Sequence, residues 1–253
     1  MIKSRQAGVV FSIFVFFLLT GTLRAQTGFY WEQPEIFSPA AGSFPVSAFN
    51  ENLSLVAWQE TEAEPASRSG GGGDGHITVS LAVKPSGGEW RVYRSVGGPY
   101  SYSGTEPSIL SAAVDRDNRI FLAAAVSANE TEILISDDRG ESFSRVRVDS
   151  GSESSIAPRL YPRADGGYLI FITRGQEQSL SIYYARSDDG FTWSDFQPFV
   201  SDSSLQLNFL PTHSFLNGTD YVIFQSFLGG AGVTPSLQLV LGSSPGGGPS
   251  WTL

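Results

Sequence analysis

The chain has 253 residues, with 25 acidic residues against 16 basic ones, a formal net charge of −9 and no cysteine. Because such a chain repels phosphate backbones and contains no cluster of Lys and Arg, its composition argues against a nucleic-acid partner. The lack of cysteine excludes disulfides and a lipid-modified cysteine, so a packed core must supply the stability of the folded chain.

The N-terminus has the residue order of a secretory signal peptide. Lys3 and Arg5 form a basic start, residues 8–19 are almost wholly apolar, and Ala25 offers a small residue for cleavage. An uncleaved membrane anchor is the alternative, although the apolar run is shorter than the about 20 residues that a bilayer core requires. The sequence therefore favours export over anchoring.

Cleavage after Ala25 separates a signal peptide, residues 1–25, from a mature chain, residues 26–253. The mature chain keeps 13 basic and 25 acidic residues, so its net charge is about −12. We expect it to reach the periplasm or the extracellular space, and no later segment is apolar enough to span a membrane. It is long enough to bury a core, either as one domain or as a regular array.

The composition after the signal peptide is that of a β-sheet protein. Glycine and proline supply 42 of the 253 residues, and Val, Ile, Phe, Tyr, Thr and Ser fill most of the segments between them. No segment has a convincing helical period. Four short apolar runs bounded by turn residues predict buried strands. They are LSLVAW (53–58), RIFLAAAV (119–126), YLIFITR (168–174) and YVIFQSF (221–227).

Four units follow one another with the same order of parts. Each begins near a proline, runs one strand into an Asn/Asp/Gly turn, returns on an apolar strand, and sends a third strand into a polar turn ending in an aromatic residue. The prolines are Pro45, Pro107, Pro158 and Pro211, and the aromatic residues are Trp90, Phe143, Trp193 and Trp251, spaced 53, 50 and 58 residues apart. A four-stranded unit repeated every about 40–50 residues predicts the blade of a β-propeller, and paired hairpins in a sandwich are the alternative.

Two of the polar turns share one order of residue types. SDDRGESF carries Ser136, Asp138, Gly140 and Phe143, and SDDGFTW, one residue shorter, carries Ser187, Asp189, Gly190 and Trp193. In such a turn the Ser and Asp oxygens accept hydrogen bonds from amides, the glycine takes a positive φ, and the aromatic ring fills the hairpin. The other two units keep the aromatic residue and the glycines but have Pro85 and Gly246 where the acid stands.

This pattern resembles the Asp-box, or BNR repeat, of sialidases and related propellers. The resemblance implies that Asp138 and Asp189 lie on the outer edge of a blade as turn anchors and are not catalytic acids. Sialidase-like rings have six blades, whereas this chain supplies about four four-stranded antiparallel blades. We therefore expect an all-β propeller that forms a small ring, self-associates, or is the front part of a larger propeller. Residues 27–39 resemble the tail of a blade and could close such a ring.

The same resemblance gives an incomplete set of catalytic residues. Sialidases bind the substrate carboxylate with three arginines and use a Tyr/Glu pair and an acid/base Asp. The first arginine precedes an Ile-Pro in that family, whereas Phe44 precedes Pro45 here, so this arginine is absent. Arg68 and Asp74 in the glycine-rich insert have the layout of an arginine followed by the acid/base, or else belong to a solvated loop.

Arg159 and Arg174 are candidate substrate-binding residues. Either arginine could reach the central channel and bind a carboxylate through two hydrogen bonds, or could be an ordinary surface charge. The chain has only two histidines, His76 and His213, and no carboxylate at ligand spacing, so neither a metal site nor another cofactor is expected.

The function that these observations favour is that of an exported sialidase-like propeller that binds a glycan or an extracytoplasmic protein as a binding or scaffold module. One alternative is an exo-sialidase-type glycoside hydrolase, with Asp74 and Arg68 as catalytic residues and Arg159 and Arg174 around the substrate. An assembly factor with a protein partner is the other. The missing first arginine favours binding, but the sequence leaves open whether the protein is an enzyme.

Overall fold

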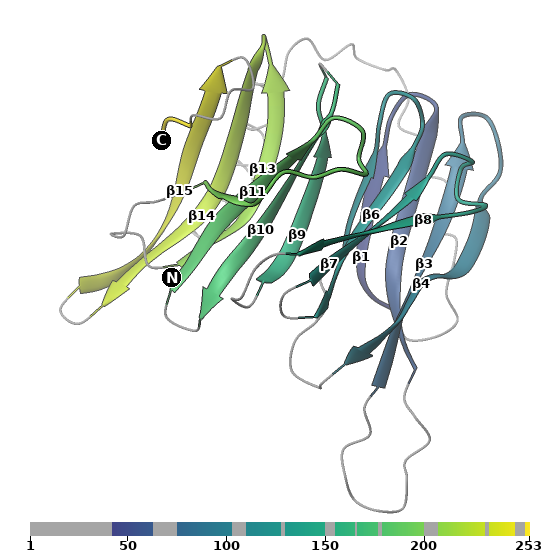
Figure 1. The fold of residues 1–253 in the computed structure, drawn as a ribbon, viewed down its shortest axis with the longest axis horizontal. Helices are drawn as coiled ribbons and strands as arrows, with labels where there is room; N and C mark the ends of the chain where they lie inside the picture. The colour runs from purple at the N-terminus through teal and green to yellow at the C-terminus, as the bar shows by residue number, and fades with distance from the viewer. Residues whose placement is uncertain are drawn as a thin grey trace, which may run out of the picture. The chain divides into compact units, whose positions relative to one another are not determined.

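A computed structural model describes residues 42–62, 75–102, 110–127, 130–149, 155–164, 166–176, 179–199, 207–230, 233–245 and 251–253. The elements in these ranges are β-strands joined by turns (Figure 1). The predicted signal peptide, residues 1–25, lies outside the described residues. Within the described ranges there is no helix with the length and apolar character needed to cross a membrane.

The strands form four consecutive antiparallel sheets, each in chain order. The first sheet contains β1 (Gly42–Phe49), β2 (Leu53–Glu62), β3 (Gly75–Pro85) and β4 (Arg91–Tyr102). The second contains β5 (Leu110–Val114), β6 (Ile120–Ser127), β7 (Glu130–Ser136) and β8 (Ser144–Asp149). The third contains β9 (Ser155–Pro162), β10 (Tyr168–Gln176), β11 (Ser179–Ser187) and β12 (Gln197–Pro198). The fourth contains β13 (Leu207–Leu216), β14 (Thr219–Gly230) and β15 (Val233–Pro245).

Two short pairings complete these sheets. Leu180 of β11 pairs with Leu207 of β13 in parallel, which joins the third sheet to the fourth. Thr252 pairs with Ser243 of β15 through two backbone hydrogen bonds of 2.8 Å, at the position where a fourth strand stands in the other sheets. The sheet boundaries agree with the four sequence units, since Pro45, Pro158 and Pro211 lie in first strands, while Pro107 lies outside the described residues.

An apolar layer fills each space between consecutive sheets. Leu122 belongs to the layer between the first and second sheets, whereas its neighbour Phe121 belongs to the layer between the second and third. Likewise Ile170 faces the second sheet and Phe171 faces the fourth. Successive side chains of a strand point to opposite faces, so a strand with a sheet on both sides must be apolar throughout. This is why β6 and β10 appear in the sequence as unbroken apolar runs.

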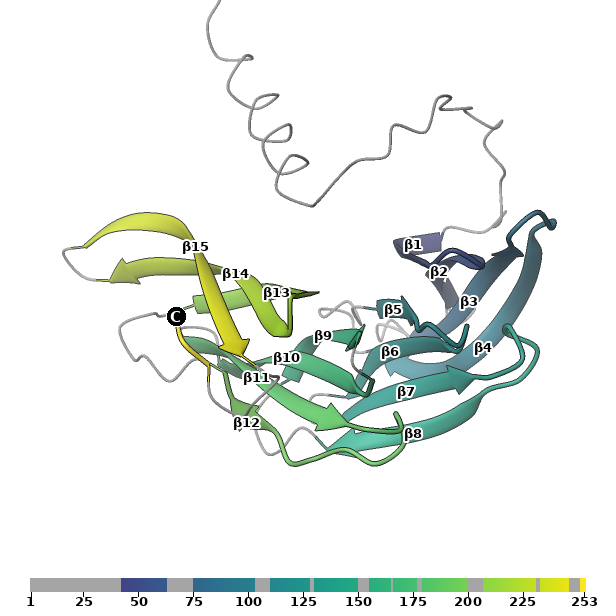
Figure 2. The ribbon, with the colours of Figure 1, turned by 90° about the horizontal axis from the view of Figure 1, so that it is seen from above.

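The first strand of each sheet lies on the inner side of the assembly of four sheets (Figure 2). β5 contacts both β1 and β9, and β9 contacts β13. Polar bonds near the turns after these strands tie neighbouring sheets together. The side-chain Nδ2 of Asn50 donates to the backbone carbonyl of Asp115 at 2.7 Å, and the hydroxyl of Tyr168 donates to the carboxylate of Asp115 at 2.7 Å. The four inner strands are thus held side by side, and they position the candidate site.

The turn from β7 to β8 contains the first set of Asp-box residues. Gly140 has a φ of +96°, and its amide donates to the hydroxyl of Ser136 at 2.7 Å. Ser142 donates both its amide, at 2.9 Å, and its hydroxyl, at 2.5 Å, to the carboxylate of Asp138. Phe143 packs against the apolar layer between the first and second sheets.

The turn from β11 to β12 contains the second set. Asp189 accepts the amides of Phe191 and Thr192 at 2.7 and 2.8 Å, while the amide of Gly190 donates to Ser187 at 2.8 Å. Gly190 has a φ of +84°, and a Cβ there would lie 2.8 Å from Phe121 of the neighbouring sheet. The indole of Trp193 donates to the carbonyl of Gly190 at 2.9 Å. Both carboxylates are therefore engaged in holding turns at the outer part of their sheets.

These turns predict a pH dependence of stability. Hydrogen bonds from the Ser142 hydroxyl and amide lower the pKa of Asp138 to about 2, and the amides of Thr192 and Phe191 lower the pKa of Asp189. An Asp in the unfolded chain has a pKa of about 3.9, so the stabilisation is present above about pH 4 and is lost as the pH falls toward 2. The urea midpoint should therefore fall over this window, and it should fall less steeply in the double variant Asp138→Asn, Asp189→Asn.

The matched control for this prediction is Asp188→Asn, which changes the acid next to Asp189 in the turn from β11 to β12. Its urea midpoint should follow the wild-type curve between pH 4 and pH 2. A double variant whose curve is as steep as that of the wild type would show that the two turn carboxylates do not link folding to pH.

Candidate binding cleft on the inner strands

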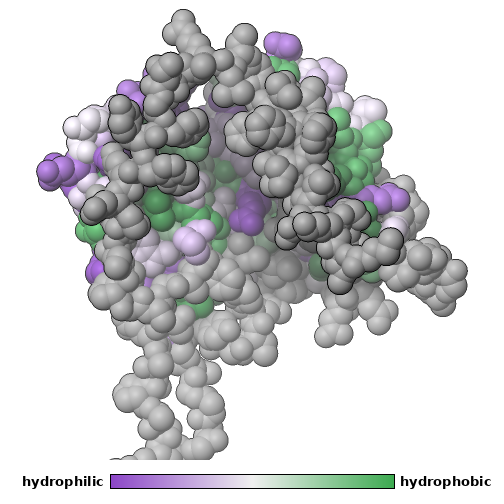
Figure 3. Space-filling model, turned by 180° about the vertical axis from the view of Figure 1, so that it is seen from behind, coloured by the Kyte–Doolittle hydropathy of each residue, from purple (hydrophilic) through white to green (hydrophobic). Residues whose placement is uncertain are grey.

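A cleft of about 670 Å³ is lined by the first strands of all four sheets. From behind, Figure 3 shows hydrophobic and hydrophilic described residues around a hollow near the centre of this face. The lining residues are Val46, Ser47, Ala48 and Phe49 of β1, Ser111, Ala112, Ala113 and Val114 of β5, Arg159, Leu160, Tyr161 and Pro162 of β9, and His213 of β13.

Arg159 brings a positive charge into this cleft. Its Nη1 donates a hydrogen bond of 3.3 Å to the carbonyl of Leu110, at the start of β5. The next residue, Leu160, donates its amide to the hydroxyl of Ser111 at 3.1 Å, which fixes β9 against β5. Because a guanidinium has five N–H donors, Arg159 can keep this bond and still donate to a ligand.

Tyr161 and His213 form the wall of the cleft next to Arg159. The hydroxyl of Tyr161 donates to the carbonyl of Pro211 at 2.9 Å, and the centres of the Tyr161 and His213 rings lie 5.4 Å apart. Burial raises the pKa of Tyr161, and the nearby charge of Arg159 lowers it by a smaller amount. Tyr161 is therefore a neutral hydrogen-bonding and packing group at neutral pH.

A buried ion cluster supports this wall from behind. The Nε2 atom of His213 lies 2.7 Å from one carboxylate oxygen of Asp220, and the Nη2 atom of Arg163 lies 3.3 Å from the other. Asp220 is fully buried, and the side chain of His213 is 3 % exposed. Arg163 follows β9, whereas the other two residues belong to β13 and β14, so the cluster joins the third sheet to the fourth. It fixes the orientation of the imidazole that lines the cleft.

Sequence reasoning missed this cluster. It considered His213 only as a metal ligand, and it gave Asp220 no role. Among the described residues no group of three or more His, Cys, Asp or Glu side chains could hold a metal ion. The one feature of the sequence that marks Asp220 is its place directly before the apolar run 221–227. An acid is usually exposed, so this position alone does not predict a buried ion pair.

The described lining of the cleft supplies hydrogen-bonding and apolar groups but no carboxyl group. Glycoside hydrolysis ordinarily needs two carboxyl groups on opposite sides of the bond to be cut. The described residues that line the cleft include no Asp or Glu, and Asp220 is buried behind His213. The cleft does offer a guanidinium, an imidazole, serine hydroxyls and apolar walls, which are groups that can hold a polar ligand.

The candidate residues from the sequence do not meet in one place. Arg159 lines the cleft, but Arg174 lines a separate groove beside β8. Arg174 stands three positions after Phe171 on β10, and residues an odd number apart on a strand face opposite sides of the sheet. Arg68 and Asp74 lie outside the described residues. None of the eight Asp-box residues lines the cleft, and only Trp193 among them lines the groove.

Neither a family model nor a curated protein matches this sequence. Solved structures do match. An α-L-arabinanase from Penicillium chrysogenum, complexed with arabinobiose, is 13% identical over 80% of this chain and 62% of that chain, with a TM-score of 0.55. A protein of unknown function from Dyadobacter fermentans is 16% identical over 76% of this chain and 60% of that chain, with a TM-score of 0.52.

The chain folds as a β-propeller. The prediction of an all-β propeller built of four-stranded antiparallel blades is confirmed, and each sheet is one blade. A GH32 β-fructofuranosidase from Bombyx mori also matches, at 14% identity over 81% of this chain and 46% of that chain, with a TM-score of 0.48. The chain thus spans between 46% and 62% of the length of the three proteins named. At these identities the likeness concerns the fold alone, and the sialidase resemblance stays a prediction from the sequence.

Proposed function

We propose that this protein is an exported propeller that binds a glycan in the cleft between its inner strands, without cleaving it. The single observation that carries the proposal is the lining of the cleft, where Arg159, Tyr161 and His213 stand beside apolar residues and no described residue supplies a carboxylate. The sialidase-like pattern of the sequence is consistent with a sugar ligand.

The chemistry of the lining fits a sugar. Sugar rings carry hydroxyls, which need hydrogen-bonding partners, and C–H faces, which pack against apolar or aromatic surfaces. Arg159 and the hydroxyls of Ser47 and Ser111 can supply the polar partners. Phe49, whose side chain is 79% exposed, offers an aromatic surface in the same lining.

The prediction that tests this proposal is the effect of Arg159→Gln on glycan binding. The variant removes the charge but keeps a hydrogen-bonding side chain, and a hydrogen bond to a charged group contributes about 1.5–3 kcal/mol. Affinity for the best-binding oligosaccharide of a panel that includes arabinan fragments and sialosides, measured by calorimetry, should therefore fall at least about tenfold. Arg91→Gln on the outer strand β4 is the matched control and should bind as the wild type does.

The same panel separates the rival functions. Release of sugar by the wild type, lost in Asp74→Ala, would overturn the non-catalytic proposal in favour of a glycoside hydrolase. Failure to bind any glycan, together with specific binding of a purified extracytoplasmic protein that Arg159→Gln abolishes, would instead point to the scaffold or assembly role.

A further inference from the structure

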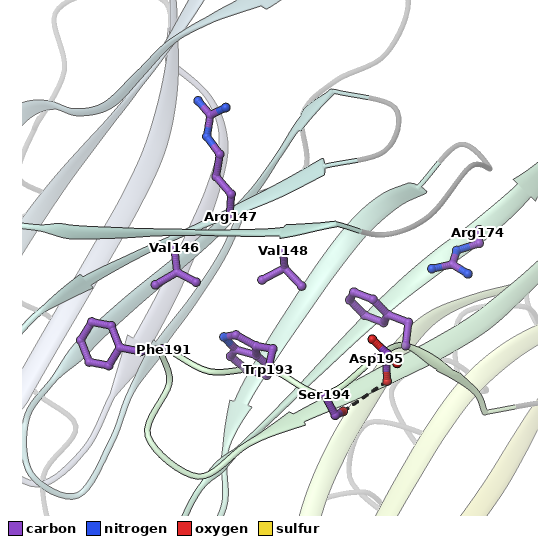
Figure 4. Close-up of a pocket in the computed structure, with 9 residues that line it drawn as sticks. Val146, Arg147, Val148, Arg174, Phe191, Trp193, Ser194 and Asp195 are labelled. Carbon is purple, nitrogen blue, oxygen red and sulfur yellow. Dashed lines mark hydrogen bonds between the residues drawn. The ribbon is translucent and has the colours of Figure 1, made fainter.

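A second pocket, of about 440 Å³, lies between the outer strand β8 of the second blade and the turn that follows β11 in the third. Figure 4 shows Val146 and Val148 pointing from β8 toward Trp193, with Arg174 at one end of the groove. Asp195 and Phe196 also line this groove. Arg147 lines the pocket as well, but its guanidinium points away from Trp193 (Figure 4) and pairs with Glu130 and Glu132.

Arg174 is held in this groove by aromatic rings. Its guanidinium carbon lies 4.2 Å from the centre of the Tyr183 ring and 5.7 Å from that of Phe196. Such cation–π contacts fix the plane of a guanidinium without using its N–H donors. The Nε atom of Arg174 is buried and has no hydrogen-bond partner. Over the described ranges, moreover, the structure shows neither a hydrogen bond nor an ion pair from Arg174.

This arrangement differs from that of other arginines in the same acidic chain. Arg119 pairs with Asp115 at 2.9 Å, Arg94 with Glu60 at 2.5 Å and Arg163 with Asp220 at 3.3 Å. The buried Nε–H of Arg174 has lost its hydration without gaining an acceptor. An anion that enters the groove would supply the missing acceptors, and it would do so against a cation that is already oriented.

The rest of the groove restricts which anion fits. The indole of Trp193 is fixed by its hydrogen bond to Gly190, and together with Phe196 it packs against the apolar layer between the second and third blades. These rings present rigid surfaces suited to the C–H face of a sugar. Asp195 adds a carboxylate to the same groove, which can accept hydrogen bonds from hydroxyls. A peptide rich in acidic residues would be repelled by Asp195, whereas a sugar that carries one carboxylate can satisfy both groups.

We propose that this groove is a binding subsite for a carboxylate-bearing sugar, such as a uronic acid residue, distinct from the cleft on the inner strands. Arg174 binds the carboxylate through two N–H donors, the aromatic rings pack against the sugar face, and Asp195 accepts hydrogen bonds from sugar hydroxyls. The subsite does not depend on glycan binding in the cleft, because Arg174 and Arg159 line separate pockets.

The test is a titration of the purified protein with glucuronate, glucose and acetate, followed by NMR and calorimetry. Glucuronate should bind at least about tenfold more tightly than glucose or acetate. Only glucuronate has both a carboxylate for Arg174 and a sugar ring for the aromatic residues and Asp195. Arg174→Gln should weaken glucuronate binding about tenfold or more, because it removes a charge-assisted pair of hydrogen bonds. Arg91→Gln, the matched surface control, should leave this binding unchanged.

Two further variants keep the test decisive. If Arg174→Gln fails to fold, Arg174→Lys replaces it in the test, because it keeps the positive charge. The lysine variant should still weaken binding, because an ammonium cannot make the bidentate contact. Arg159→Gln should not change glucuronate binding, so failure of the cleft and failure of the groove are told apart. Equal affinity for acetate, equal affinity for glucose, tighter binding of a polyglutamate peptide, or an unchanged affinity in both Arg174 variants would each overturn the proposal.

Discussion

Replacing Phe171 by alanine is expected to lower the free energy of unfolding by about 3–5 kcal/mol, the range for a buried phenylalanine truncated in a core. Phe171 is fully buried in the apolar layer between the third and fourth blades. Its ring centre lies 5.7 Å from that of Phe199, 6.1 Å from that of Tyr161 and 6.4 Å from that of His213. The substitution therefore opens a cavity behind the wall of the cleft.

The measurement is urea unfolding followed by circular dichroism, with Phe49→Ala as the matched control. Phe49 is the same residue type with a side chain that is 79% exposed, so its truncation should change the free energy of unfolding by no more than about 0.5 kcal/mol. If Phe171→Ala and Phe49→Ala cost the same, the third apolar layer does not hold the two blades together as the contacts indicate.

The blades could be predicted from the sequence because their signals are local. The apolar strands of the second and third blades lie between two sheets, so their side chains are buried on both faces and they form unbroken runs, as in Phe121 and Leu122. The turns of the second and third blades each need a glycine at positive φ and an acid one or two positions before it, and both leave a visible spacing in the sequence. The repeat of an apolar strand followed by such a turn then identifies each blade.

The site could be predicted only in part, because its parts are distant in the sequence. Arg159 was a candidate for the cleft and lines it, but nothing local distinguishes it from Arg174, which projects from the opposite face of the third blade. Which arginine faces the cleft depends on strand register, and the pairing of β9 with β10 shifts between Phe171 and Thr173. The cluster of Arg163, His213 and Asp220 has no motif at all, because it forms only when two blades pack together.

Replacing Asp220 by alanine is expected to lower the free energy of unfolding by about 3–5 kcal/mol, which is the cost of removing one partner of a buried ion pair. The carboxylate of Asp220 is fully buried between Arg163, whose side chain is 13% exposed, and His213. Its removal leaves the guanidinium of Arg163 poorly solvated and without this counter-charge. The loss is larger than that of a surface pair because water cannot replace the missing acceptor.

Two companion variants identify the cause of this loss in the same urea unfolding experiment. Asp220→Asn keeps the shape and the hydrogen bond but removes the charge, so it should recover only part of the stability if the charge of Arg163 is what Asp220 compensates. Asp117→Ala removes an acid that is 67% exposed and 3.9 Å from Arg116, and it should cost no more than about 1 kcal/mol. If Asp220→Ala costs as little as Asp117→Ala, the cluster does not join the third blade to the fourth, and His213 must be held in the cleft wall by its ring contacts with Tyr161 and Phe171 alone.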